Sequence, residues 1–151
     1  MQNFNKKLKP KSIIAQKLDD KKTKSNTHFG NFKVSFQYLD SSQKYASSFK
    51  DWQKAGLLSK MLELLQGYCC RPLREQIDGT KFTRYGDFPQ KDETMYEFPS
   101  HVPEDADWAR IHVNGPSVIV GHYVGDTFYI VFLDKTHKFW LTKKDREKFK
   151  K

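Results

Sequence analysis

A histidine flanked by lysines and followed by aromatic residues lies near the C-terminus, in the run Asp134-Lys135-Thr136-His137-Lys138-Phe139-Trp140. The imidazole of His137 can exchange a proton near neutral pH, and the ammonium groups of Lys135 and Lys138 can neutralise phosphate charge. This combination suits acid–base chemistry at a phosphodiester. The alternative is that His137 is an exposed or structural histidine, which is the commoner role of a lone histidine.

Three apolar segments precede this run and must position it. Residues 108–113, 117–124 and 127–133 have the composition and patterning of consecutive antiparallel strands. Asn114-Gly115-Pro116 forms the first turn, and Gly125-Asp126 fits a two-residue hairpin loop. If that loop sets the register, His122 faces Tyr129 across the second hairpin.

Side-chain alternation in this register sorts the three strands onto two faces. The first face is aliphatic and is expected to pack on a helix: Ala109, Ile111, Val113, Val118, Val120, Val124, Val131 and Leu133, together with His122 and Tyr129. The second mixes cations with rings: Trp108, Arg110, His112, Ile119, Gly121, Tyr123, Phe128, Ile130 and Phe132.

RNA fits the second face, because bases stack on aromatic rings while cations hold phosphate. We therefore expect nucleic acid to contact Trp108, His112, Tyr123 and Phe128, and also Trp140 beyond the last strand. The alternative is that residues 80–107 cover this face and that one of their acids pairs with Arg110.

The residues upstream predict the rest of an α+β domain. Residues 33–38 alternate like a half-buried strand, and Ser48 with Asp51 forms a capping pattern for a helix running to about Gly67. Its apolar stripe is Trp52, Leu58, Met61, Leu62, Leu65 and Cys69, although Gly56 weakens the first turns. A short helix over 72–77 and a strand over 81–85 follow. We expect the helix pair to pack on one face of an antiparallel sheet that ends in the three-strand meander.

The net charge of +9 lies at the two ends of the chain. Residues 1–27 and 135–151 each carry +6, and the part between them carries −3. We expect a disordered basic tail over 1–28, one domain over 29–142 with an irregular acidic insertion at 80–107, and a basic C-terminal tail over 143–151. The charge is therefore weak support for a generic polyanion-binding domain.

Composition excludes several functional classes. The longest strongly apolar run has six residues, so no membrane span is expected, and no secretory signal is visible. Cys69 and Cys70 are adjacent, which is no disulfide framework and suits a reducing cytoplasm; we expect both to belong to the core. No phosphate-binding glycine loop, metal-binding motif or cofactor motif is present, so neither a metal nor a cofactor is expected.

The order strand, helix, short helix and three-strand meander resembles the RelE/YoeB/ParE superfamily of small bacterial toxins. The meander residues 108–133 look like the central sheet of that superfamily, with Arg110 on its first strand and His137 just past its last. The stretch 108–139 also resembles a group of uncharacterised bacterial proteins. This chain is longer than a typical superfamily member, and no catalytic glutamate can be aligned.

The resemblance implies ribosome-dependent cleavage of mRNA, in which a 2′-hydroxyl attacks the adjacent phosphate without a metal. It implies that Arg110 stabilises the transition-state phosphate, that His137 acts as acid or base, and that Lys135 or Lys138 neutralises charge. An antitoxin-like protein would be the partner, beside RNA or the ribosome.

The same fold is compatible with functions that involve no RNA cleavage. A ParE-type member of the superfamily acts on gyrase and would have the same order of elements. A non-catalytic RNA- or protein-binding protein of a bacterial or phage family would use the same sheet face. A structural or regulatory protein, whose basic tails serve only solubility, also fits the sequence.

Overall fold

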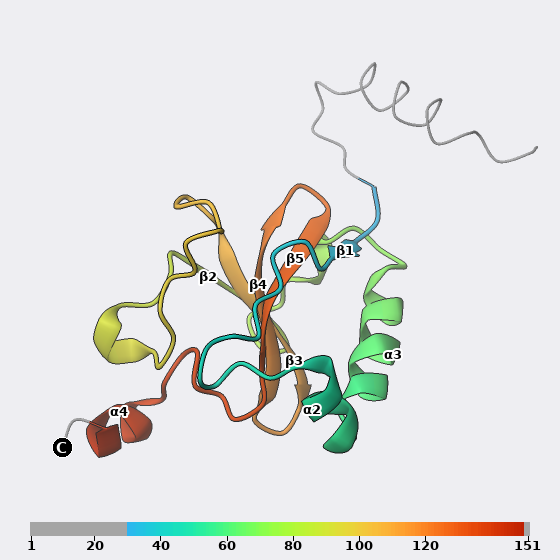
Figure 1. Ribbon diagram of the computed structural model, residues 1–151. Coiled ribbons are helices and arrows are strands. Elements are labelled where there is room, and N and C mark those ends of the chain that lie inside the picture. The colour runs from blue at the N-terminus through green and yellow to red at the C-terminus, as the bar shows by residue number, and fades with distance from the viewer. Residues whose placement is uncertain (1–29, 150–151) are drawn as a thin grey trace, which may run out of the picture. The chain divides into compact units, whose positions relative to one another are not determined.

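The computed structural model describes residues 30–149, so the predicted tail over 1–28 lies outside the described residues. The fold is α+β, with a five-stranded mixed sheet, as the sequence predicts in class (Figure 1). The elements are β1 (Lys33–Ser35), α2 (Phe49–Lys54), α3 (Leu58–Tyr68), the 3₁₀ turns η2 (Arg74–Gln76) and η3 (Lys91–Glu93), β2 (Phe82–Gly86), β3 (Trp108–Asn114), β4 (Ser117–Val124), β5 (Thr127–Asp134) and α4 (Lys143–Phe149).

The predicted first helix begins where expected and then breaks. The Ser48 hydroxyl accepts the Asp51 backbone N–H at 3.1 Å, and the Asp51 carboxylate accepts the Ser48 N–H, which completes the predicted capping box. The helix stops at Lys54 because Gly56 adopts a left-handed conformation with φ 74°, and α3 starts afresh at Leu58. The continuous helix of the sequence prediction is therefore two helices, and the predicted helix over 72–77 is reduced to the 3₁₀ turn η2.

The strand order is β1-β5-β4-β3-β2. The β2–β5 part is antiparallel throughout, and its meander has the predicted turns. The edge strand β1 runs parallel to β5, with Lys33 opposite Thr127, so the sheet is mixed and not purely antiparallel. A salt bridge of 2.7 Å between Lys33 and Asp126 lies at the start of this parallel pair.

Two bulges in the meander change the predicted faces. The Gly125-Asp126 hairpin has the expected register, with His122 opposite Tyr129. Beyond it, Val131 is an extra residue on β5, and Val113 is an extra residue on β3. Because each extra residue shifts the register by one, β3 and the far half of β5 present the opposite faces from those predicted relative to β4.

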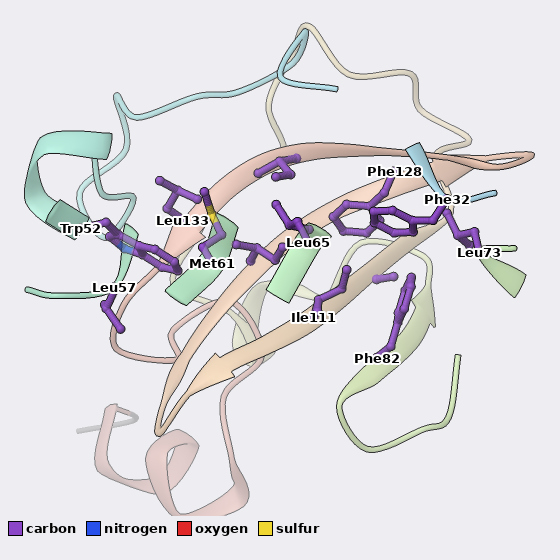
Figure 2. Close-up of a cluster of buried hydrophobic side chains, with 13 residues drawn as sticks. Phe32, Trp52, Leu57, Met61, Leu65, Leu73, Phe82, Ile111, Phe128 and Leu133 are labelled. Atoms are coloured by element: carbon purple, nitrogen blue, oxygen red, sulfur yellow. The ribbon is translucent and has the colours of Figure 1, made fainter. Parts of the chain in front are cut away.

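One face of the sheet packs on the helices (Figure 2). Met61 and Leu65 of α3 and Trp52 of α2 are buried against it, and the rings of Phe32 and Phe128 stack with centroids 6.1 Å apart. The strand residues in this cluster are Phe82, Ala109, Ile111, Ile119, Phe128, Ile130 and Leu133.

The opposite face is covered by the segment between β2 and β3, and it is not the open RNA-binding face that the sequence predicts. Tyr96 and Val102 pack there on Val118, Val120 and Val131, which were wrongly predicted to face the helices. Trp108, Phe132 and Phe139 complete this second cluster of buried residues. The predicted insertion is therefore an integral layer of the domain.

The structure also differs from the sequence predictions for the two cysteines, for Leu62 and for the C-terminal tail. Cys69 and Cys70 are free and exposed just after α3, so the prediction that they belong to the core is wrong. Leu62 of the predicted apolar stripe is also exposed, because it lies beyond the edge of the arc of α3 that Met61 and Leu65 bury. The first part of the predicted C-terminal tail forms the short helix α4.

Candidate functional site

The turn that carries His137 is held by a buried carboxylate. Asp134, the last residue of β5, is 0% exposed. Its Oδ1 accepts the backbone N–H of Lys138 at 3.0 Å, and its Oδ2 accepts that of Phe139 at 2.9 Å. The hydroxyl of Tyr96 lies 3.1 Å from Oδ1. These contacts fix the backbone from 134 to 139 in one conformation.

His137 occupies the strained position of this turn. Its φ of 61° is positive, a conformation that residues other than glycine adopt rarely. Its ring is half-buried, and its Nδ1 is buried without a hydrogen-bond partner among the described residues. Burial raises the pKa of Asp134, and the N–H donors, the Tyr96 hydroxyl and the charge of His137 each oppose that rise. The histidine and the carboxylate are therefore electrostatically coupled.

Arg110 lies against an aromatic pair. The rings of Tyr85 and Trp140 are stacked, with centroids 4.6 Å apart and planes inclined by 10°. Burial raises the pKa of Tyr85 to about 12, while the Arg110 guanidinium lowers it in part through its charge and a hydrogen bond to the phenol. Tyr85 is an extra residue on β2, between the pairs Arg84–Ala109 and Gly86–Trp108. This bulge aims its ring at Trp140 and Arg110, as bulges beside functional sites often do.

We call this group the basic–aromatic edge: Tyr85, Arg110, His137, Lys138 and Trp140. Arg110 and Tyr85 come from adjacent strands, while the other three residues follow one another closely beyond β5. All five are half-buried, so each has part of its surface in solvent. In the described part of the chain, no salt bridge involves Arg110, so the predicted pairing with an acid of the 80–107 segment is not present.

Of the four predicted catalytic residues, Arg110 contacts Tyr85, which stacks on Trp140, while His137 and Lys138 lie in the turn that leads from Asp134 to Trp140. Lys135 lies elsewhere. The pKa of Asp51 is lowered first by its bonds to Ser48 and further by the charge of Lys135, which places Lys135 near the start of α2. Lys135 is therefore better placed to interact with α2 than with a phosphate beside Arg110.

Of the five residues predicted to bind nucleic acid, Trp140 reaches the edge. Trp108 and Phe128 are each 0% exposed, in the two opposite cores, so the prediction that they stack on bases is wrong. The physical reason is the bulge at Val113, which puts Trp108 on the opposite face of the sheet from Phe128, together with the layers that cover both faces. Packing thus takes away the open aromatic platform that the sequence predicted.

His112 and Tyr123 are half-buried and take part in other contacts. The Nε2 of His112 contacts the carbonyl of Gly115 in the turn after β3, so this ring is engaged in local structure. Tyr123 packs on the helix-side core and lies near the exposed salt bridge between Arg84 and Asp107. Neither ring belongs to the basic–aromatic edge.

Sequence reasoning missed Asp134, Tyr96 and Tyr85 as residues that build the site. An acid at the end of an apolar strand was a usable signal for Asp134, because a turn with several free N–H groups follows it. Tyr85 and Tyr96 had no such signal. Their roles depend on a bulge and on a contact between segments 38 positions apart.

A separate cleft lies between residues 39–45 and 95–101. Its volume is about 710 Å³, and none of the predicted site residues lines it. Gln43 joins its two walls by donating to the Glu97 carbonyl and accepting the Glu97 N–H, each at 2.8 Å. Within residues 30–149, no group of three or more His, Cys, Asp or Glu side chains is arranged to hold a metal ion.

Two findings bear on the chain as a whole. In the part that the structure describes, no helix has the length and apolar character needed to cross a bilayer. No protein-family model, no curated protein and no solved structure matches the chain.

Proposed function

We propose that the protein is a RelE-like, metal-independent endoribonuclease whose active site is the basic–aromatic edge. The observation that carries the proposal is the set of contacts that links Arg110 on β3 through Tyr85 to Trp140, at the end of the Asp134-anchored turn that bears His137 and Lys138. A fixed guanidinium, an imidazole and an ammonium group supply what phosphodiester transfer at RNA requires.

The reaction would be an internal transfer. The 2′-hydroxyl of one nucleotide attacks the adjacent phosphorus and loses its proton, while the 5′-oxygen of the next nucleotide leaves and gains one. Arg110 would stabilise the extra negative charge on the phosphorus oxygens, and His137 would supply or remove a proton. Lys138 would attract the phosphate, and Trp140 would stack on a base of the single strand.

The partners follow from this function. The substrate would be mRNA, free or on the ribosome, in the cytoplasm. An antitoxin-like protein would inhibit the enzyme by covering the basic–aromatic edge. These partners belong to the proposal, as does the toxin–antitoxin role.

A second candidate is a non-catalytic protein that binds RNA or a protein through the same edge. The surroundings of His137 favour this second candidate, because the ring atom Nδ1 is buried and has no hydrogen-bond partner in the described residues. One ring nitrogen at most could then serve as acid or base. RNA cleavage moves a proton at the attacking oxygen and another at the leaving oxygen. With one usable ring nitrogen, His137 can serve only one of these two oxygens at a time.

The test compares RNA cleavage by matched pairs of variants. Purified protein is incubated with an end-labelled mRNA, with and without translating ribosomes, and the products are mapped. We expect Arg110→Gln and His137→Gln each to lower the cleavage rate by roughly 100-fold or more. Arg84→Gln and His101→Gln serve as controls, since Arg84 pairs with Asp107 and His101 lies by the separate cleft.

Three outcomes discriminate the candidates. Cleavage that both edge variants lose and both control variants keep supports the endoribonuclease. Binding of RNA without cleavage under either condition supports the non-catalytic protein. Cleavage at the wild-type rate by both edge variants excludes the basic–aromatic edge as the active site.

A further inference from the structure

The buried side chains of Asp134 and Tyr96 and the backbone carbonyl of the half-buried Tyr45 form a chain of hydrogen-bonding groups that is one proton short. The hydroxyl of Tyr96 lies 2.9 Å from the Tyr45 carbonyl oxygen and 3.1 Å from Oδ1 of Asp134. A carbonyl oxygen and an ionised carboxylate can only accept, and a phenol has one proton to donate. If Asp134 is ionised, one of these two contacts therefore brings together two acceptors.

A proton on Asp134 removes the conflict. The acid then donates to the Tyr96 oxygen, and the Tyr96 hydroxyl donates to the Tyr45 carbonyl, so that both contacts are hydrogen bonds. The N–H groups of Lys138 and Phe139 can still bond to the carboxyl oxygens of the neutral acid. Since Asp134 is 0% exposed and Tyr96 is 4% exposed, water cannot readily replace a missing partner.

Burial is the influence that favours the neutral form of Asp134, whereas the two backbone N–H donors, the charge of His137 and a Tyr96 hydroxyl that donates to the carboxylate all favour the ionised form. Burial raises the pKa of Asp134, and the pKa of Tyr96 is raised by burial and by the proximity of Asp134. The titratable groups that face Asp134 are Tyr96 from the segment after η3, His137 from the turn and Tyr85 from β2. From the side of residues 45–47 the contacts are made by backbone, through the bridge between Ala46 and Asp134.

We propose that Asp134 is a positioning residue whose carboxyl group is protonated in the folded chain, and that this proton holds the His137 turn against Tyr96. This contact joins the turn to the layer that covers the sheet. The Lys138 carbonyl also accepts the Met95 N–H at 2.9 Å, so the same two segments meet again beside this contact. The part of this inference that concerns catalysis rests on the proposed function; the protonation of Asp134 does not.

Loss of the proton should loosen the turn. With Asp134 ionised, Tyr96 can satisfy either the carboxylate or the Tyr45 carbonyl. The other acceptor is then short of a donor, and local opening of residues 134–139 relieves this. The position of His137 thus depends on pH through the carboxyl group of Asp134 and not only through the His137 ring.

The test is an NMR titration of the aspartate side-chain carboxyl carbons and the His137 ring in the full chain. We expect the Asp134 midpoint to lie above the ordinary value of about 3.9, and the His137 resonances to change at the same midpoint. In Tyr96→Phe the neutral acid loses its acceptor, so the Asp134 midpoint should fall by about half a pH unit or more. Tyr45→Phe is the matched control, because it removes a hydroxyl and leaves the Tyr45 carbonyl in place.

The sign of the shift decides the matter. If Asp134 is instead an ionised acceptor of the Tyr96 proton, Tyr96→Phe removes a donor from the carboxylate and the midpoint rises. A midpoint that rises or stays the same in Tyr96→Phe, or a wild-type midpoint at or below about 3.9, overturns the proposal. The titration needs no RNA, so it tests the protonation of Asp134 even if the cleavage assay shows no activity. Likewise, a negative titration result does not affect the cleavage assay.

Discussion

Trp108 on β3 lies directly opposite His122 on β4, and their rings share one face of the sheet with centroids 6.1 Å apart. The His122 ring also stacks on Tyr129 at 5.1 Å and packs against Tyr38 at 5.2 Å. It is 2% exposed, and neither ring nitrogen has a hydrogen-bond partner among the described residues. Aromatic rings thus surround the His122 imidazole, and among the described residues no hydrogen-bond acceptor stabilises its protonated form.

We predict that His122 makes the fold sensitive to mild acid. Burial lowers the pKa of His122 in the folded state, with Asp105 opposing in part, so the folded protein binds fewer protons at this site than the unfolded chain. Stability should therefore be full above the unfolded pKa of about 6.5 and should fall as the pH drops below it. Urea unfolding at several pH values between about 7.5 and 5 measures this dependence.

His122→Phe supplies the comparison, because it keeps a ring at this position and removes the titrating group. Its unfolding free energy should fall less steeply over the same pH range than that of the wild type. Parallel pH profiles for the two proteins would show that His122 is not responsible.

We predict that Gly121 does not tolerate a side chain. A Cβ at this position would overlap the Tyr129 carbonyl oxygen and lie 2.9 Å from the carbonyl carbon, both in the neighbouring backbone. Since a paired strand cannot move aside easily, Gly121→Ala should destabilise the fold by about 2 kcal/mol or more. Thermal and urea denaturation measure the change.

Gly67 provides the matched substitution. It lies inside α3, and a Cβ there would meet nothing within 4 Å. Gly67→Ala should therefore leave stability unchanged or raise it by up to about 1 kcal/mol, through better helix propensity. Equal effects at Gly121 and Gly67 would contradict the close approach of β4 and β5.

We predict opposite consequences for two tryptophans. Trp108 is 0% exposed in the second core, so Trp108→Ala should destabilise the protein by about 3–5 kcal/mol. Trp140 is half-buried at the basic–aromatic edge, so Trp140→Ala should mainly weaken the binding of single-stranded RNA, by about 1–3 kcal/mol at fixed salt. Chemical denaturation and fluorescence anisotropy with a labelled oligonucleotide separate the two effects.

A Trp140→Ala protein that folds and binds RNA as the wild type does would remove this ring from the interface. A Trp108→Ala protein of unchanged stability would contradict the burial of Trp108.

The sequence predicts where the helices and strands lie better than it predicts which side chains of the strands share a face of the sheet. Alternation and turn residues locate the meander, and the Ser48 capping box locates the first helix. The bulges at Val113 and Val131 have no comparable signal, and each one shifts a register by one residue. That shift is enough to place Trp108 and Ile119 on opposite faces of the sheet, where simple alternation predicts one shared face.

The candidate site shows the same division. Residue chemistry singles out Arg110, His137, Lys138 and Trp140; the fold links Arg110 to Trp140 through Tyr85 and holds His137 and Lys138 in the turn that precedes Trp140. Residue chemistry does not distinguish Lys138 from Lys135, because their separation depends on the path of the turn after β5. Nor does it predict the parallel pairing of β1 or the burial of Asp134, which are set by contacts between distant parts of the chain.

The parallel placement of β1 constrains how this chain can be assembled on the ribosome. Lys33 and its partner Asp126 are 93 positions apart, whereas β3, β4 and β5 pair with their neighbours in sequence. The meander can therefore form as soon as it emerges, while β1 waits for nearly the whole domain to be synthesised. Until β5 is complete, β1 lacks the strand with which it pairs, and Phe32 lacks the stacked ring of Phe128.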